Sequence, residues 1–199
     1  MVVPVVPEAV TAKGWQAFVE AVADQAGRGE GAVLVGHSGA GPLLPQIAAR
    51  ARRPLGPLVF VDAGIPPVAG EVELMPTEFL VELRAMACDG KLPRWSEWFG
   101  PGVMEELVPD DDRRAAICAE LPQVPVTYFE ERPPVPTGWS MAACGYLQLS
   151  EPYAADAAEA SCRGWPVVDL PGAHLDIVVH PDATAEAILS LVVRLASRP

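Results

Sequence analysis

The sequence predicts an α/β fold: a mostly parallel sheet of about five strands with helices on both faces and one helical insertion. Two observations lead to this prediction. Short apolar runs of the buried-strand type, 32–35 and 58–61, alternate with segments of helical periodicity such as 15–26. Parallel strands need crossover connections of this kind, and the crossover helices then cover the sheet. The 199 residues, 50% of them hydrophobic, suit a single domain, 1–199, with a full core.

The first part of the chain is predicted to supply three of the strands. Val2–Val6 is a β-branched run broken by Pro4, which is typical of a strand near a sheet edge. Trp15–Ala26 has apolar residues at helical spacing, and Gly27–Gly29 is expected to end that helix. The run 32–35 predicts a buried strand, 42–53 the helix after it, and 58–61 a second buried strand.

Between about 65 and 139 prolines and tryptophans become dense and strand patterns scarce. Thr77 is placed to cap a helix, and 91–101, which contains Trp95 and Trp98, is predicted as a loop. We expect a helix over 113–121 and a short strand over 124–129. Aspartates 110–112 precede that helix, where carboxylates serve capping and the helix dipole more often than metal binding.

The last part of the chain returns to the alternating pattern. Strands are predicted over 145–150 and 165–170, with an alanine-rich helix over 153–163 between them. An amphipathic helix over 181–196 follows the second of these strands. The alternation therefore resumes after the insertion, as one continuous sheet requires.

Charge and composition exclude several classes of function. The net charge of −12 argues against nucleic acid and against anionic membranes, which both need a basic surface. Four widely spaced cysteines form neither a zinc motif nor a disulfide framework, so we expect a reducing, cytoplasmic setting. No apolar run is long enough to span a membrane, and the start lacks the basic residues of a signal peptide. No nicotinamide, flavin or metal motif is present, so no cofactor is implied.

The residues around Ser38 carry the clearest chemical signal. A serine at a strand-to-helix corner is lifted clear of the sheet, and the N–H groups that open the helix can stabilise an oxyanion. A side chain at Gly36, Gly39 or Gly41 is expected to collide with the neighbouring strand or helix. The alternatives are a glycine-rich turn with an incidental serine and a phosphate loop, which the absence of a lysine after Gly41 excludes.

A serine hydroxyl becomes a nucleophile only beside a base that an acid orients. The chain has three histidines. His37 belongs to the corner, with its ring expected to point away from the exposed face of Ser38, and His180 suits a surface role. His174 lies on a loop after the last predicted strand, beside Gly172, and is the candidate base.

The segments Leu34–Gly41 and Gly172-Ala173-His174-Leu175 resemble the nucleophile elbow and histidine loop of α/β-hydrolases. The nearest resemblance is to small bacterial esterase-like members of the hydroxynitrile-lyase and methyl-esterase type. The elbow departs from G-x-S-x-G, since its last glycine falls one place later, at Gly41. The resemblance implies an abbreviated α/β-hydrolase fold, with Ser38 as nucleophile, His174 as base and the insertion of about 65–139 as a lid.

The acid is open between two residues. Glu151 ends the strand before the last one, which matches the usual place of the acid in this superfamily, and we favour it over Asp62. Asp62 ends the strand after the elbow, where some members carry the acid. Asp176 lies too close to His174 in sequence to orient the ring easily.

Substrate binding is expected at Gly39 and His37, with the Gly39 N–H as oxyanion donor and Trp95 and Trp98 lining an acyl pocket. The His-Gly type loop that normally donates a second N–H is missing. The donor would then come from the lid, from the turn around Pro7 or from a partner subunit. A shortened sheet also leaves an edge that a homodimer would cover.

These features predict a serine hydrolase that acts on a small, acyl-containing ester, thioester or lactone. Two alternatives stay open. One is a lyase, isomerase or cyclase of secondary metabolism, in which His174 is the acid–base group and Ser38 only binds substrate. The other is an inactive binding relative, which the missing oxyanion loop favours.

Overall fold

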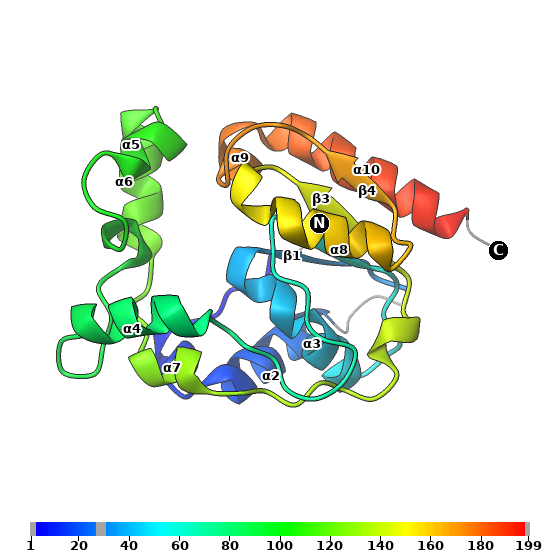
Figure 1. The fold of residues 1–199 in the computed structure, drawn as a ribbon, viewed down its shortest axis with the longest axis horizontal. Coiled ribbons are helices and arrows are strands. Elements are labelled where there is room, and N and C mark those ends of the chain that lie inside the picture. Colours follow the sequence, from blue (N-terminus) through cyan, green and yellow to red (C-terminus); the bar gives the residue numbers. More distant parts are fainter. Residues whose placement is uncertain (1–2, 27–30, 198–199) are drawn as a thin grey trace. The chain divides into compact units, whose positions relative to one another are not determined.

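The computed structural model describes residues 3–26 and 31–197, and these form two compact units (Figure 1). Among the described residues, the first unit contains 3–4, 19–26, 31–72 and 134–197, and the second contains Val5–Phe18 and Glu73–Pro133. Helix α2, Trp15–Ala26, begins in the second unit and ends in the first. The second unit holds most of the segment expected to be a lid, and the lid role stays a prediction.

A four-stranded parallel sheet forms the centre of the first unit. Its strands are β1 (Leu34–His37), β2 (Leu58–Val61), β3 (Cys144–Gln148) and β4 (Val167–Asp169), and they lie side by side in chain order. The register sets His37 opposite Val61, and Val61 opposite Leu147. The strands therefore end together, which is the edge of a parallel sheet where ligands bind.

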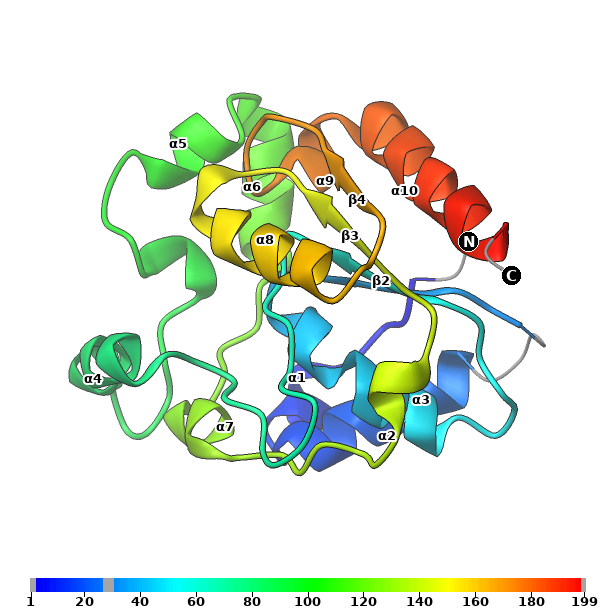
Figure 2. The same cartoon turned by 45° about the vertical axis from the view of Figure 1, so that its right-hand side comes forward.

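Helices cover both faces of this sheet, as the alternation of the sequence predicts (Figure 2). Side chains of β2 and β3 that point to one face, Val59, Val61 and Leu147 among them, pack with Leu191 and Leu195 of α10, Pro181–Ala196. Helices α3 (Leu44–Arg50) and α8 (Ala154–Cys162) contact the sheet as well, and α8 lies across the strands from α10. The inner strands β2 and β3 are thus buried on both faces, except for the last residue of β3.

The corner after β1 is a 3-10 turn, η1 (Ser38–Leu43), that leads into α3. A Cβ on Gly41 would lie 2.5 Å from the Ala63 Cβ, and a Cβ on Gly36 would lie 2.9 Å from Leu44. Both glycines are therefore required for close packing, and Gly41 fills the role of the displaced elbow glycine. The expected collision at Gly39 was wrong, because a Cβ there meets no atom within 4 Å.

The first unit is completed by short helical segments at the ends of its strands. These are η3 (Trp139–Met141), η4 (Glu151–Tyr153) and α9 (Asp176–Val179). Two of them flank the edge of the sheet where the strands end, since η4 follows β3 and α9 follows the loop after β4.

The second unit is helical. It contains α1 (Glu8–Thr11), α4 (Thr77–Met86), η2 (Trp95–Glu97), α5 (Val103–Leu107), α6 (Asp111–Glu120) and α7 (Val126–Glu130). Its core is small: Leu80, Leu83 and Leu92 are buried, and partly buried residues such as Phe79, Trp98 and Phe129 pack around them. The core of the second unit therefore relies on aromatic contacts, whereas the core beside the sheet is aliphatic.

Four expectations fail in detail. Residues 3–7 form no strand, and Val2 lies outside the described residues, as does Gly27–Gly29. Within the described residues the sheet has four strands rather than about five. Residues 124–129 contain helix α7 instead of a strand. Thr77 does not cap α4, since its hydroxyl donates to Glu73. Asp110 does cap α6, by accepting from the Arg113 N–H at 2.7 Å.

The described helices include none with the length and apolar character needed to cross a bilayer. The four cysteines, Cys88, Cys118, Cys144 and Cys162, are free thiols.

Candidate active site

Ser38 and Asp62 occupy two strained corners at neighbouring strand ends. Ser38 has φ 54° and Asp62 has φ 43°, and both values lie in the left-handed region that non-glycine residues rarely adopt. The Ser38 N–H donates to the Asp62 carbonyl at 3.2 Å, so the corners are tied together. Both side chains lie at the edge of the sheet where the strands end.

His174 lies between them. Its Nε2 is 3.0 Å from Ser38 Oγ, and its Nδ1 is 3.0 Å from Asp62 Oδ2. An ionised carboxylate only accepts hydrogen bonds, so Nδ1 carries the proton and Nε2 accepts from the Ser38 hydroxyl. The three groups form one hydrogen-bonded chain from carboxylate to hydroxyl, the arrangement in which a serine can be deprotonated as it attacks.

Asp62 is fully buried, and its two oxygens accept four hydrogen bonds. Oδ1 accepts from the N–H groups of Leu149 at 2.7 Å and Ser150 at 3.0 Å. Oδ2 accepts from the Ser150 hydroxyl and from His174. Burial alone raises the pKa of Asp62, but these hydrogen bonds outweigh it and hold the pKa below its ordinary value. The carboxylate therefore stays ionised and fixed in place.

Glu151 does not reach this site. It is exposed in η4, and Asp62 already occupies the ring nitrogen that an orienting acid would use. The geometry thus gives Asp62 the place that the sequence favoured for Glu151.

Asp176 stabilises the loop that carries His174, because its Oδ2 accepts from the Ala173 N–H at 3.1 Å. A Cβ on Gly172 would lie 1.9 Å from that oxygen, so only glycine fits there.

His37 contacts the loop that carries His174. Its Nε2 lies 2.8 Å from the His174 carbonyl oxygen, and the two rings lie 4.5 Å apart. Burial, reinforced by the neighbouring His174, lowers the pKa of His37 to about 4, so the ring is neutral at pH 7. A neutral ring donates its Nε2–H to the carbonyl. We therefore propose that His37 positions the loop rather than binding substrate.

Tyr153 was not singled out by the sequence. Its ring stacks on His174 with centroids 5.1 Å apart and an angle of 9°, and its phenol hydrogen-bonds Ser38. Burial raises the pKa of this phenol. No motif marks the residue; the available signal was an aromatic side chain two places after a candidate acid, at the start of a predicted helix.

Trp95 and Trp98 belong to the second unit. Trp98 donates from Nε1 to the Pro93 carbonyl at 2.9 Å and packs edge-on against Phe129, and Trp95 packs against Phe99. Both are half-buried members of the aromatic cluster in that unit. Their expected role in an acyl pocket stays a prediction.

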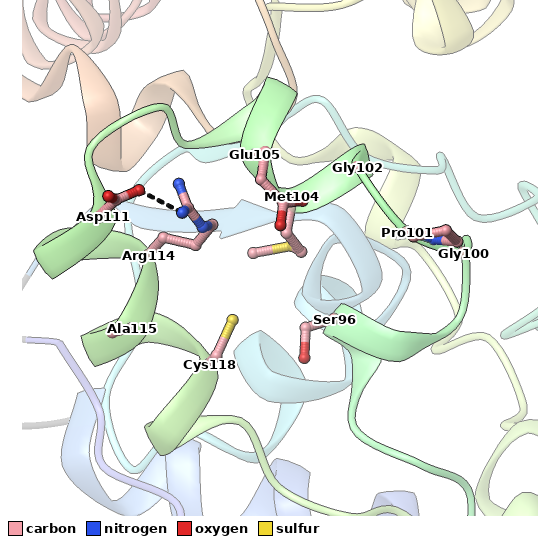
Figure 3. Close-up of a pocket in the computed structure, with 10 residues that line it drawn as sticks. All are labelled: Ser96, Gly100, Pro101, Gly102, Met104, Glu105, Asp111, Arg114, Ala115 and Cys118. Carbon is pink, nitrogen blue, oxygen red and sulfur yellow. Dashed lines mark hydrogen bonds and ion pairs between the residues drawn. The ribbon is translucent and has the colours of Figure 1, made fainter.

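The second unit also holds a pocket of about 340 Å³ between α5 and α6 (Figure 3). Met104, Arg114 and Cys118 line it, and Arg114 is already paired with Asp111 and with the Val108 carbonyl. The described residues include no group of three or more His, Cys, Asp or Glu side chains placed to hold a metal ion. The hydrogen-bonded chain of the first unit is therefore the strongest candidate site.

Residues 4–187 match the model of the Alpha/beta hydrolase family, and the chain belongs to that family. Its fold, a parallel sheet flanked by helices, is the fold of this class. No curated protein sequence matches the chain.

Solved structures give the same class. One is an extracellular alpha/beta-hydrolase from a Paenibacillus species, described as sharing structural and functional homology with tobacco salicylic acid binding protein 2. It has 18% sequence identity and a TM-score of 0.69, and the match covers 91% of this chain and 81% of that chain. Polyneuridine aldehyde esterase has 13% identity and a TM-score of 0.64, over 93% and 81%. The pyrethroid hydrolase PytH has 18% identity and a TM-score of 0.62, over 98% and 80%. At these identities the likeness concerns the fold.

Proposed function

We propose that the protein is a serine hydrolase that cleaves a small ester, thioester or lactone. One observation carries this proposal: Asp62, His174 and Ser38 are hydrogen-bonded in that order, with 3.0 Å at each contact of His174. A buried, ionised carboxylate fixes the ring so that Nε2 faces the hydroxyl, which is the requirement for general-base activation of serine.

The reaction has two halves. In the first, Ser38 Oγ bonds to the acyl carbon, its proton passes to His174 Nε2, and the carbonyl electron pair moves onto oxygen. The oxyanion collapses, and the leaving alcohol or thiol departs with the proton from His174. In the second half, water attacks the acyl-serine and gives its proton to His174. That proton returns to Ser38 Oγ when the acid product leaves.

The named neighbours support an ester as substrate, since one is polyneuridine aldehyde esterase and another a pyrethroid hydrolase. Gly39 also suits this chemistry, because it is exposed in the first turn of η1, where backbone N–H groups lack helical partners and can donate to an oxyanion.

Labelling with a fluorophosphonate and hydrolysis of p-nitrophenyl acetate test the proposal. Wild type is expected to be labelled, and Ser38→Ala to lose labelling and ~10,000-fold or more of kcat. Ser140→Ala, which changes an exposed serine, is the matched control and should behave as wild type. Turnover that survives Ser38→Ala but not His174→Ala would overturn hydrolysis by Ser38 and select the lyase or isomerase alternative.

A further inference from the structure

We propose that the phenol of Tyr153 is a catalytic hydrogen-bond donor to the oxyanion, beside the N–H of Gly39. The inference rests on the proposed hydrolase function and adds a residue to it. Two observations carry it: the Tyr153 phenol hydrogen-bonds the nucleophile while its ring stacks on His174, and most backbone donors around Ser38 are already engaged.

Four backbone N–H groups near the nucleophile have partners. The Ser38 N–H donates to the Asp62 carbonyl at 3.2 Å. The Ala63 N–H donates to the Tyr146 hydroxyl, and those of Leu149 and Ser150 donate to Asp62. Gly39 is left as a backbone donor at the helix opening, and a single donor gives weaker stabilisation than the usual pair.

The hydrogen bond of Tyr153 has a defined direction. Because the Ser38 hydroxyl donates to His174 Nε2, Ser38 Oγ accepts from the phenol O–H. Stacking of the tyrosine on the His174 ring fixes the direction from which the phenol approaches. Burial raises the pKa of the phenol above its ordinary value, so it is a protonated donor at neutral pH.

Attack by Ser38 changes which oxygen is the better acceptor. When the Oγ–C bond forms, Oγ becomes an ether-type oxygen with little residual charge, while the former carbonyl oxygen carries a full negative charge. Both oxygens are bonded to the same carbon, so the phenol O–H needs only a small rotation to move from one to the other. The phenol keeps its proton throughout, and collapse of the oxyanion returns the hydrogen bond to Oγ. The donor is thus weakly engaged before attack and strongly engaged in the transition state, as catalysis requires.

Tyr153→Phe is the decisive variant because it keeps the ring and its stacking on His174 and removes only the O–H. Tyr128→Phe makes the same change at a buried tyrosine of the second unit and is the matched control. Two readouts are needed: kcat and KM for p-nitrophenyl acetate, and the Kd of phenylboronic acid, which forms a tetrahedral adduct with an active serine. We expect Tyr153→Phe to lower kcat ~100-fold with KM within about threefold of wild type, and to weaken boronate binding by a similar factor.

The outcomes separate this inference from the proposed function. If wild type hydrolyses the ester through Ser38 and Tyr153→Phe matches it in both readouts, the inference is overturned and the hydrolase stands. If wild type binds the boronate at Ser38 without turning over the ester, weaker binding by Tyr153→Phe supports the inference while the proposed function falls. A wild type that shows neither turnover nor boronate binding overturns both.

Discussion

The corners after β2 and β3 each carry a candidate acid, and they differ in backbone and burial. Asp62 ends β2 with φ 43° and a fully buried carboxylate. Ser150 and Glu151 follow β3, where Ser150 is extended, with φ −134°, and Glu151 lies exposed in η4. The β3 corner therefore supplies donors to the carboxylate, from the Leu149 and Ser150 N–H groups and the Ser150 hydroxyl. The difference teaches that the backbone turn after a strand, rather than the order of acids in the sequence, decides which one faces the histidine.

Replacing the carboxylate of Asp62 is expected to have the largest effect. Asp62→Asn leaves a side chain of the same shape that no longer favours the Nδ1–H tautomer of His174, and we expect kcat to fall by ~10,000-fold. Steady-state hydrolysis of p-nitrophenyl acetate measures this, with circular dichroism as the check on folding. Activity within tenfold of wild type would place the acid elsewhere and break the comparison.

Removing the Ser150 hydroxyl is expected to have an intermediate effect. Ser150→Ala takes one donor from a buried charge and should lower the free energy of unfolding by about 1–3 kcal/mol at pH 7. Because the folded pKa of Asp62 lies below 3.8, the stability that its ionised form contributes is present above 3.8 and lost as pH falls through the lowered value. The difference between variant and wild type should therefore shrink below about pH 4. Urea unfolding at pH 7 and pH 3 tests this, and a difference that is equal at both pH values contradicts it.

Glu151→Gln is expected to have the smallest effect. The side chain is exposed and lies outside the hydrogen-bonded chain, so kcat should stay within about twofold of wild type and stability within about 0.5 kcal/mol. The same ester assay measures it beside Asp62→Asn. A loss of 100-fold or more would show that Glu151 enters the site when substrate is bound.

The sequence predicted the sheet well because its signals were local. The run 58–61 is β2 over the expected residues, and the periodic segments 15–26 and 181–196 are α2 and α10 at their expected bounds. The second unit was harder. Val124 to Phe129 mixes β-branched and aromatic residues, which favour strands, yet Pro125 presets the backbone for a helix start, and Val126 and Phe129 pack on the Leu80 and Leu83 core. Tertiary packing there overrides local propensity.

The candidate site was likewise predictable from the sequence only in part. Ser38 and His174 were marked by a strand–turn–helix motif and a loop position, which a sequence displays directly. The choice between Asp62 and Glu151 depends on a positive φ and on donors from another strand, and neither can be recognised in the residues alone. Tyr153 has no motif, since its part comes from stacking on a ring 21 positions further along the chain.

The pairing of β1 with β2 has a consequence for how the protein becomes active during synthesis. The proposed nucleophile, Ser38, and the proposed acid, Asp62, follow adjacent, in-register strands and are joined by a main-chain hydrogen bond, whereas His174 comes after β4, more than a hundred residues later. A nascent chain that contains only β1 and β2 has the Ser38 hydroxyl and the Asp62 carboxylate but no histidine between them. Under the proposed function, catalytic competence begins only when the C-terminal part of the chain docks, and a ribosome-bound fragment lacking it is expected to be inert toward esters.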